Sequence, residues 1–363
     1  MKTIILTGGG TGGHVIPHLS LIPFIKKDFD KIVYIGTKPS IENDIMKNVE
    51  GVIFEEITAS KFRRDKKLSL LSLPFKVAKS TCQAKKILKK YRPDVVFSKG
   101  GYVSVPVCIA SKMLKIPIVS HESDLSMGLS NKIIYRLCTT FCTTFDSTTK
   151  NLKKAVFTGP PIRRELFFGD SNKGLELTSI SPENFSKKPT ILFTGGSTGA
   201  ESLNNIVFDN IGILTRDFNI VHLVGKKKSK KLPNTDSYTQ IEYCDHIEHL
   251  FAMASVVVSR SGSNVIFELL ALNKPMILIP LSNSASRGDQ VDNAKYFEEK
   301  QYAKVIFEES LTIQKLVSAI KEELQKTKDN NTKKDKIKTS LSQKKEIDGT
   351  KNIYLEILKA TKR

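Results

Sequence analysis

The sequence predicts an α/β protein with two domains, each built around a parallel β-sheet. Short apolar segments rich in β-branched residues alternate with longer amphipathic stretches through both halves of the chain, as in successive βαβ units. The glycine-rich segment IILTGGGTGGH at residues 4–14 is nearly repeated as ILFTGGSTGAE at residues 191–201. The chain of 363 residues is also too long for one ordinary hydrophobic core. The repeat therefore indicates two domains of similar construction.

The candidate strands are short, and each is separated from the next by sequence of helix length. In the first half they are residues 3–7, 31–36, 52–57, 94–98 and 116–121, and in the second half 189–194, 219–224, 256–260 and 275–280. This alternation predicts helices on both faces of each sheet.

The expected domain boundaries follow from a change in composition. Residues 163–188 are polar, contain Gly, Pro and Ser, and have no clear hydrophobic period, so we expect a linker there. This assigns residues 1–162 to an N-terminal domain and residues 189–344 to a C-terminal domain. Residues 345–363 are expected to form a helix that can return to the N-terminal domain, although periodicity alone does not decide where it packs.

The composition limits the classes of partner and the compartment. A net charge of +20 indicates an anionic partner such as nucleic acid, an anionic membrane surface or a phosphorylated substrate. The five cysteines include no C-x-x-C pair, so we expect reduced thiols and no zinc site. The sequence shows neither a secretory signal nor an apolar run long enough to cross a bilayer, and we expect a cytoplasmic protein.

Four glycine-containing turns follow candidate strands and are candidate anion sites. They are residues 8–14, 99–106, 195–200 and 260–268. A turn between a strand and a helix directs backbone N–H groups and the positive end of the helix dipole at one point. The first turn contains G-x-G-x-x-G, but the second strand ends in Gly-Thr-Lys and the next acid is Glu42, so a nicotinamide or flavin site is not favoured. The chain has no G-x-x-x-x-G-K-[ST], which excludes a P-loop.

Seven motifs occur together in a characteristic order. They are GGTGGH (9–14), GGYVS.P (100–106), HE with GLSNK (121–132), GPPIR (159–163), GGSTGA (195–200), RSG....E (260–268) and DQ..NA (289–294). On these motifs the chain resembles the MurG family of N-acetylglucosaminyltransferases from its first strand to about residue 295. The resemblance implies the GT-B architecture, in which two Rossmann-like domains face each other across a cleft. It also implies inverting transfer of N-acetylglucosamine from its UDP ester to the 4-hydroxyl of N-acetylmuramoyl-pentapeptide on undecaprenyl pyrophosphate, in peptidoglycan synthesis.

The resemblance assigns the acceptor to the N-terminal half. His14, where the first glycine turn enters a helix, is the candidate base that takes the proton from the acceptor hydroxyl. Glu122 is the second candidate catalytic residue, and it could orient His14, lie near the acceptor or only cap the next helix. The implied acceptor-pyrophosphate residues are Gly12, Gly13, Gly100, Gly101, Tyr102 and Ser104. His18 has the spacing of a metal pair with His14 but no third ligand, and the resemblance calls for no metal or other cofactor.

The implied donor-binding residues lie mostly in the second half. They are Thr11, Gly12, Gly13, Asp124, Arg163, Ser197, Cys244, Ser263, Asn264, Val265, Glu268 and Gln290. The chain departs from the family pattern at several of these motifs. Ser123 and Asp124 stand in place of Gln and Asn, Thr198 and Glu201 in place of Gln and Arg, and Val265 in place of Thr. Asp124 keeps a hydrogen-bond acceptor but loses the amide donor and adds a negative charge near a diphosphate.

Residues 61–92 carry twelve Lys or Arg and one acid, Asp65, with apolar residues interleaved. A basic amphipathic segment of this kind is typical of a helix on an anionic membrane surface, although a solvated helix face in a lysine-rich protein gives the same charge. The expected membrane patch consists of Leu68, Leu70, Leu71, Leu73, Phe75, Lys66, Lys67 and Lys76. It predicts a peripheral protein on the cytoplasmic face of the bacterial inner membrane, bound to anionic inner-leaflet lipids.

Two other functions fit parts of the sequence. One is a related UDP-sugar transferase that acts on diacylglycerol or another lipid. The other is a non-enzymatic nucleic-acid-binding protein, suggested by the charge, but the chain has no Trp and no known nucleic-acid signature. The expected partners are therefore UDP-N-acetylglucosamine, the lipid-linked acceptor, anionic lipids and cell-wall synthesis proteins, with no nucleic acid.

Overall fold

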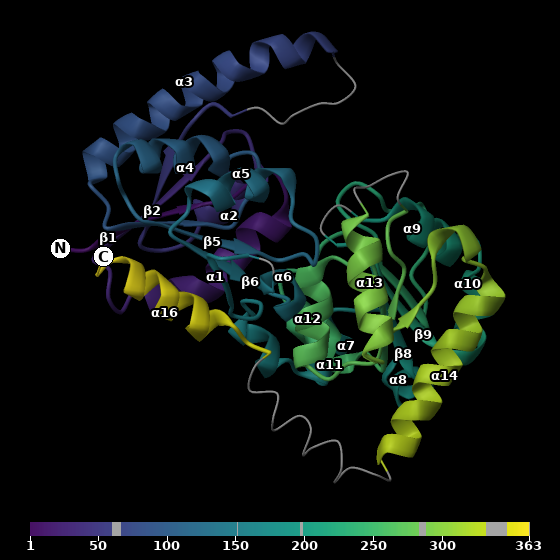
Figure 1. Cartoon of the computed structure of the whole chain (residues 1–363). Helices are drawn as coiled ribbons and strands as arrows, with labels where there is room; N and C mark the ends of the chain where they lie inside the picture. The colour runs from purple at the N-terminus through teal and green to yellow at the C-terminus, as the bar shows by residue number, and fades with distance from the viewer. Residues whose placement is uncertain (60–66, 151, 197–198, 283–287, 332–346, 363) are drawn as a thin grey trace. The chain divides into compact units, whose positions relative to one another are not determined.

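The computed structural model describes residues 1–59, 67–150, 152–196, 199–282, 288–331 and 347–362 (Figure 1). The chain divides into two compact units. Unit 1 contains residues 1–163 and 348–363, and unit 2 contains residues 164–347. Each unit contains one parallel sheet, so the α/β class with two parallel sheets, expected from the sequence, is confirmed.

The sheet of unit 1 has the strand order β3-β2-β1-β4-β5-β6-β7 among the described residues. The strands are β1 Thr3–Thr7, β2 Lys31–Gly36, β3 Val52–Glu56, β4 Val95–Ser98, β5 Ile118–Glu122, β6 Thr140–Thr143 and β7 Ala155–Phe157. Every residue of β1, β4, β5 and β6 is buried, as expected for parallel strands covered on both faces. The order reverses between β1 and β4, and open α/β sheets bind ligands beyond the carboxyl ends of the strands at such a point.

The sheet of unit 2 repeats this arrangement with the order β10-β9-β8-β11-β12-β13 in the described part of the chain. Its strands are β8 Thr190–Thr194, β9 Asn219–Leu223, β10 Tyr238–Ile241, β11 Val256–Ser259, β12 Met276–Leu278 and β13 Lys304–Val305. In both units the first strand lies at the reversal point, beside the second and fourth strands. The glycine repeat in the sequence therefore marks a repeat of the sheet topology.

Helices cover the sheet of unit 1, and one of them comes from the end of the chain. They are α1 Gly12–Ile25, α2 Ile41–Met46, α3 Lys67–Tyr91, α4 Ser104–Met113, α5 Leu129–Leu137, α6 Asp146–Thr149 and α16 Thr350–Ala360. α16 packs on α1 (Figure 1), and its Ile353 and Ile357 are fully buried in the same core as β1 and β2. Gly349 N donates to Pro160 O at 2.7 Å and so fixes the start of this helix.

Three helices of unit 2 lie in the segment expected to be a linker: η1 Arg164–Phe168, α7 Ser171–Glu176 and α8 Pro182–Lys187. The helices that follow in unit 2 are α9 Glu201–Phe208, α10 Ile211–Asp217, α11 Ile247–Met253, α12 Ser263–Ala271, α13 Asp289–Glu299, η2 Glu308–Ser310 and α14 Ile313–Asn331. Residues 163–188, expected to be a linker, thus contain short helices and, from residue 164 on, belong to unit 2. Asp170 and Ser181 accept hydrogen bonds from backbone N–H groups at the starts of α7 and α8, and α7 packs on α11. Such short capped helices leave no hydrophobic period in the sequence.

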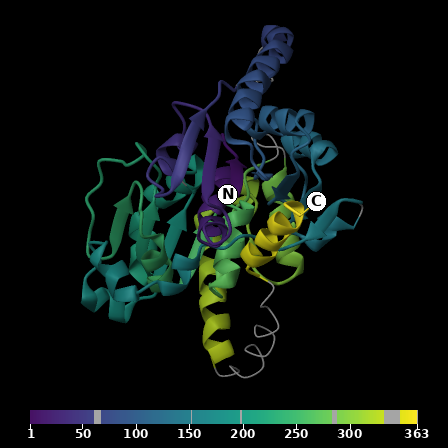
Figure 2. The ribbon, with the colours of Figure 1, turned by 90° about the vertical axis from the view of Figure 1, so that its left-hand side faces the viewer.

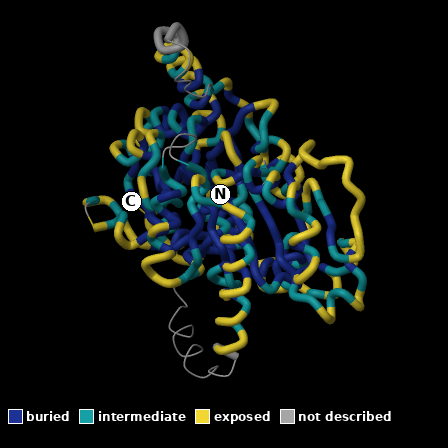
Figure 3. The backbone as a smooth tube through the Cα atoms, turned by 90° about the vertical axis from the view of Figure 1, so that its right-hand side faces the viewer, coloured by how far each residue is buried: buried dark blue, intermediate teal, exposed yellow. Residues whose placement is uncertain are grey.

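Burial is greatest in the interior of each unit (Figure 3), where the central strands are buried, whereas the edge strands β3 and β7 of unit 1 include exposed residues. α3 packs on α4 through one part of its length and extends past the rest of unit 1 at its first turns (Figures 1 and 2). No helix in the described residues is long and apolar enough to cross a membrane.

Candidate functional site

The first two glycine turns lie against each other at the carboxyl ends of β1 and β4. A Cβ atom at Gly101 would lie 2.2 Å from Gly9 O, and Gly101 has a φ of +83°. A Cβ atom at Gly10 would lie 2.6 Å from the Tyr102 ring. Because neither position has room for a side chain, the two turns form one backbone surface at the strand reversal point.

Glu42 fixes the first of these turns. Its fully buried carboxylate accepts from Gly10 N at 3.3 Å and from Thr37 Oγ1 at 2.6 Å. This acid follows β2, and the sequence analysis used it only as evidence against a dinucleotide site. In the fold it accepts from one N–H group of the turn and so fixes the backbone at Gly10.

His14 lies in the first turn of α1, half-buried, with Nδ1 3.1 Å from Thr11 Oγ1. His18, one turn later, is fully buried, with Nδ1 3.2 Å from Val15 O and its ring edge-on to Tyr34 and Phe97. Burial lowers the pKa of His18 to about 3. His18 is therefore a neutral residue of the unit 1 core.

Glu122 holds the loop that follows β5. Its Oε1 accepts from Ser123 N at 2.9 Å and Asp124 N at 3.2 Å, and its Oε2 accepts from Gly128 N at 3.1 Å and Asn131 Nδ2 at 3.0 Å. Burial, followed by the charge of Asp124, raises the pKa of Glu122. A carboxylate with two donors on each oxygen is organised to shape the 123–128 loop and the start of α5, which favours the capping alternative for this residue.

The third glycine turn lines a cavity of about 520 Å³ in unit 2, beyond the carboxyl ends of β8 and β11. Its lining residues are Gly195, Gly199, Ala200, Glu201, Ser202, Asn205, Arg260, Leu281, Gln290 and Glu308. The cavity contains the start of α9, whose backbone N–H groups and dipole favour an anion.

The Arg260 guanidinium is fixed at this cavity by four contacts. Nη1 donates to Ile279 O at 3.1 Å and Pro280 O at 3.3 Å, and Nη2 donates to Ser202 Oγ at 2.9 Å and Glu308 Oε1 at 2.7 Å. Burial alone would raise the pKa of Glu308, but hydrogen bonds from Ser202 and Arg260 lower it overall. The sequence analysis missed Arg260 and Glu308 as site residues, since their pairing spans 48 positions.

Models of two enzyme domains match these two units. The N-terminal domain of glycosyltransferase family 28 matches residues 4–143, and its C-terminal domain matches residues 190–350. The chain belongs to glycosyltransferase family 28. The reversal-point turns of units 1 and 2 are thus the equivalent sites of two glycosyltransferase domains, and the two-domain GT-B class expected from the sequence is confirmed.

Curated relatives of this family 28 chain carry a specific name. A protein of Clostridium tetani is 47% identical over 86% of this chain and 87% of its own length, and one of Lachnospira eligens is 46% identical over 88% and 90%. Both are named UDP-N-acetylglucosamine–N-acetylmuramyl-(pentapeptide) pyrophosphoryl-undecaprenol N-acetylglucosamine transferase. The crystal structure of Acinetobacter baumannii MurG covers 99% of this chain and 100% of its own, with a TM-score of 0.72 at 21% identity, which supports the fold.

Among the remaining expected donor residues, Gln290 lines the unit 2 cavity. Gln290 Oε1 accepts from Leu281 N at 3.0 Å, and Ser261 Oγ donates to Gln290 O at 2.8 Å. Ser261 thereby ties Gln290 to the start of α12, which carries Ser263, Asn264, Val265 and, buried one turn later, Glu268. Cys244 precedes α11 and Arg163 ends unit 1. Ser197 and Thr198 lie outside the described residues.

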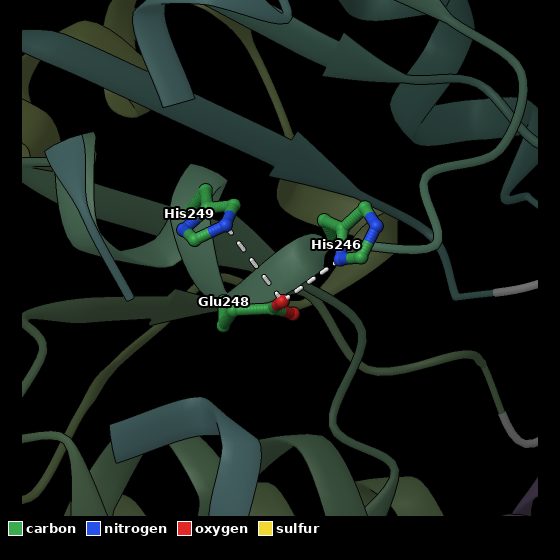
Figure 4. A group of neighbouring side chains, drawn as sticks. All are labelled: His246, Glu248 and His249. Atoms are coloured by element: carbon green, nitrogen blue, oxygen red, sulfur yellow. Dashed lines mark hydrogen bonds and ion pairs between the residues drawn. The ribbon is translucent and has the colours of Figure 1, made fainter. Parts of the chain in front are cut away.

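One group of side chains in unit 2 has the composition of a metal site: His246, Glu248 and His249 (Figure 4). His246 Nδ1 lies 3.1 Å and His249 Nε2 4.0 Å from Glu248 Oε1. Asp170 N donates to His249 Nδ1 at 3.0 Å, so the neutral ring carries its proton on Nε2, toward Glu248. A protonated nitrogen offers no lone pair to a metal, and the group is better explained by hydrogen bonding.

The expected membrane patch falls on α3 and is only partly described. Phe75 is 79% exposed, Lys76 is exposed and Leu73 is half-buried. Lys66 and the side chains of Lys67, Leu68, Leu70 and Leu71 lie outside the described residues. An exposed phenylalanine beside a lysine on a projecting helix is compatible with the expected surface.

Proposed function

We propose that this chain transfers N-acetylglucosamine from UDP-N-acetylglucosamine to the 4-hydroxyl of N-acetylmuramoyl-pentapeptide on undecaprenyl pyrophosphate. The observation that carries the proposal is the 47% identity, over most of both chains, to the Clostridium tetani transferase named for these substrates. The geometry supports it, because unit 1 has a backbone surface next to a histidine and unit 2 has an anion cavity.

The chemical step is a single displacement. The acceptor oxygen bonds to the anomeric carbon while the bond from that carbon to the β-phosphate oxygen breaks, and the electron pair leaves with UDP. His14 Nε2 takes the acceptor proton. In the tautomer that donates Nδ1–H to Thr11 Oγ1, Nε2 has the lone pair that a base requires. The acceptor pyrophosphate is bound by residues of the first two glycine turns, namely Gly12, Gly13, Gly100, Gly101, Tyr102 and Ser104.

Unit 2 binds the donor and stabilises the leaving group. The departing UDP gains negative charge, and the start of α9 directs backbone N–H groups and a positive dipole end toward the cavity. Arg163 contacts the diphosphate or the uracil and Ser197 is assigned to the diphosphate, while the guanidinium of Arg260, paired with Glu308, is held at the cavity wall. The buried Glu268 accepts the ribose hydroxyls, Gln290 and Asp124 contact the sugar, and the backbone at Cys244 contacts the uracil.

Unit 1 docks on the anionic inner leaflet through α3, at the cytoplasmic face of the membrane, where the lipid acceptor is embedded. The exposed Phe75 inserts among the lipids, and Lys76 and its basic neighbours bind the headgroups. Protein partners of cell-wall synthesis would gather at the same surface.

The decisive experiment is transfer of labelled N-acetylglucosamine from UDP into a butanol-extractable lipid acceptor by the full chain. The expected result is a labelled product with the pentapeptide-bearing lipid and none with diacylglycerol. Labelling of diacylglycerol alone would overturn the proposed acceptor, and no transfer to either lipid would overturn the reaction.

A further inference from the structure

Lys99 places an ammonium group in the interior of unit 1, directly after β4. The residue is 1% exposed, and its Nζ lies 2.6 Å from His121 Nδ1 and within hydrogen-bond distance of Ser123 Oγ. Transfer of an ammonium group from water into a protein interior costs several kcal/mol unless its new partners compensate. The roles proposed above leave this group unused, so its retention beside the acceptor turn needs an explanation.

The hydrogen bonds around His121 show which group carries the proton. His121 Nε2 lies 3.1 Å from Gly159 O, a carbonyl that only accepts, so Nε2 carries a hydrogen. Burial and the charge of Lys99 hold the pKa of His121 well below its usual value, so the ring is neutral and Nδ1 offers a lone pair. Lys99 therefore donates to His121, and the chain of contacts runs across the carboxyl ends of β4 and β5 to Gly159.

Two carboxylates near His121 in the sequence, those of Glu122 and Asp124, act on the charge of Lys99. Burial lowers the pKa of Lys99 to about 7, and the negative charges of Glu122 and Asp124 oppose this shift. Asp124 in turn raises the pKa of Glu122, as expected for two like charges in proximity. Without the ammonium group, the two carboxylates would repel each other with no buried cation to offset them.

Two side chains thus fix the segment of residues 121–124, which comprises the end of β5 and the start of the loop after it. Glu122 fixes it through the N–H groups of Ser123 and Asp124, and Lys99 fixes it through the His121 ring and the Ser123 hydroxyl. Asp124, the proposed contact to the donor sugar, is the last residue of this doubly held segment.

We infer that Lys99 is a positioning residue for sugar transfer: its buried ammonium holds the His121–Asp124 segment and neutralises the charge of Asp124 where that residue meets the donor sugar. This inference rests on the proposed function, because it takes the sugar contact of Asp124 from it. It explains how an acid is tolerated at that position beside a diphosphate-linked sugar.

The test is a double-mutant cycle in the full chain with Lys99→Met, Asp124→Asn and the double variant, measured as kcat, KM and UDP affinity. Lys99→Met should lower kcat by about 10-fold or more, while UDP affinity stays within about twofold. Adding Asp124→Asn to Lys99→Met should restore kcat by at least about fivefold, because the uncompensated charge is then gone. Lys132→Met, at an exposed lysine of α5, is the control and should show no coupling to Asp124→Asn.

If the wild-type chain transfers sugar and the effects of Lys99→Met and Asp124→Asn on kcat are additive, the inference is overturned. Absence of transfer by the wild type would instead overturn the proposed function. If Lys99→Met does not fold, Lys99→Gln takes its place in the cycle, since it removes the charge and keeps a donor for His121. Restoration of kcat by Asp124→Asn in that background supports the inference, and additivity there overturns it.

Discussion

The carbonyl oxygen of Gly9 lies 2.2 Å from the position that a Cβ atom would take at Gly101. This contact joins the turn after β1 to the turn after β4, although 92 positions separate the two glycines. The backbone surface proposed for the acceptor pyrophosphate exists only because both residues lack side chains. The integrity of that surface can therefore be tested with a single methyl group.

Gly101→Ala should abolish sugar transfer while UDP binding by unit 2 remains. The new Cβ would overlap Gly9 O, and the φ of +83° would strain an alanine, so unit 1 should lose about 2–5 kcal/mol of stability. The control is Gly212→Ala in α10, because a Cβ atom at that position would meet nothing within 4 Å. This substitution should leave the stability of the chain unchanged or raise it slightly. Urea unfolding, transfer rate and UDP titration are the measurements, and unimpaired transfer by Gly101→Ala would contradict the packed-turn surface.

His14→Ala should lower turnover by about 100-fold or more with little change in UDP affinity, because the acceptor hydroxyl loses its base. Thr11→Val removes the hydroxyl at His14 Nδ1 and should have a smaller effect, about 3- to 10-fold. Steady-state transfer at saturating donor is the measurement. Turnover of His14→Ala near the wild-type value would remove His14 from the role of base.

His18 should make unit 1 sensitive to acid. Its pKa is about 3 in the folded chain and 6.5 when exposed, so between these values the unfolded state binds more protons and stability falls as the pH is lowered. Linkage gives a loss of about 2 kcal/mol between pH 7 and pH 5 from this residue. His18→Gln should remove that part of the pH dependence, as measured by urea unfolding at both pH values. The exposed His246→Gln is the control, and an unchanged pH dependence in His18→Gln would contradict the assignment.

Phe75→Ser should weaken binding of the chain to vesicles that contain phosphatidylglycerol. Phe75 is 79% exposed on α3, and insertion of a phenylalanine contributes roughly 1.5–3 kcal/mol, so a loss of about 10-fold in affinity is expected. Phe168→Ser is a matched control, since Phe168 is 68% exposed on η1 of unit 2. Equal losses in both variants, seen by vesicle sedimentation, would argue against docking through α3.

Local sequence determined much of the fold of this protein. Strands that the sequence predicts, such as β1 and β8, are apolar runs that are buried along their whole length and lead into a glycine turn. The strands that were missed are β6, β7, β10 and β13, of two to four residues. Strands as short as β4, β11 and β12 were predicted because they lie in longer apolar runs, whereas the missed strands lie in runs with polar residues such as Thr140 and Gln240 and are fixed by pairing to a neighbouring strand.

The motifs also located the two glycine turns and His14, because turn chemistry and helix starts are properties of a few consecutive residues. The tertiary structure alone decided which buried charges meet. Glu42 reaches Gly10, Lys99 reaches His121 and Arg260 reaches Glu308 across 22 to 48 positions of sequence. A charge in the protein interior must find a partner, but the choice of partner depends on which strand ends the sheet order brings together. The sequence therefore determined where the chemistry lies, and the packing of the sheets decided how each group is held and charged.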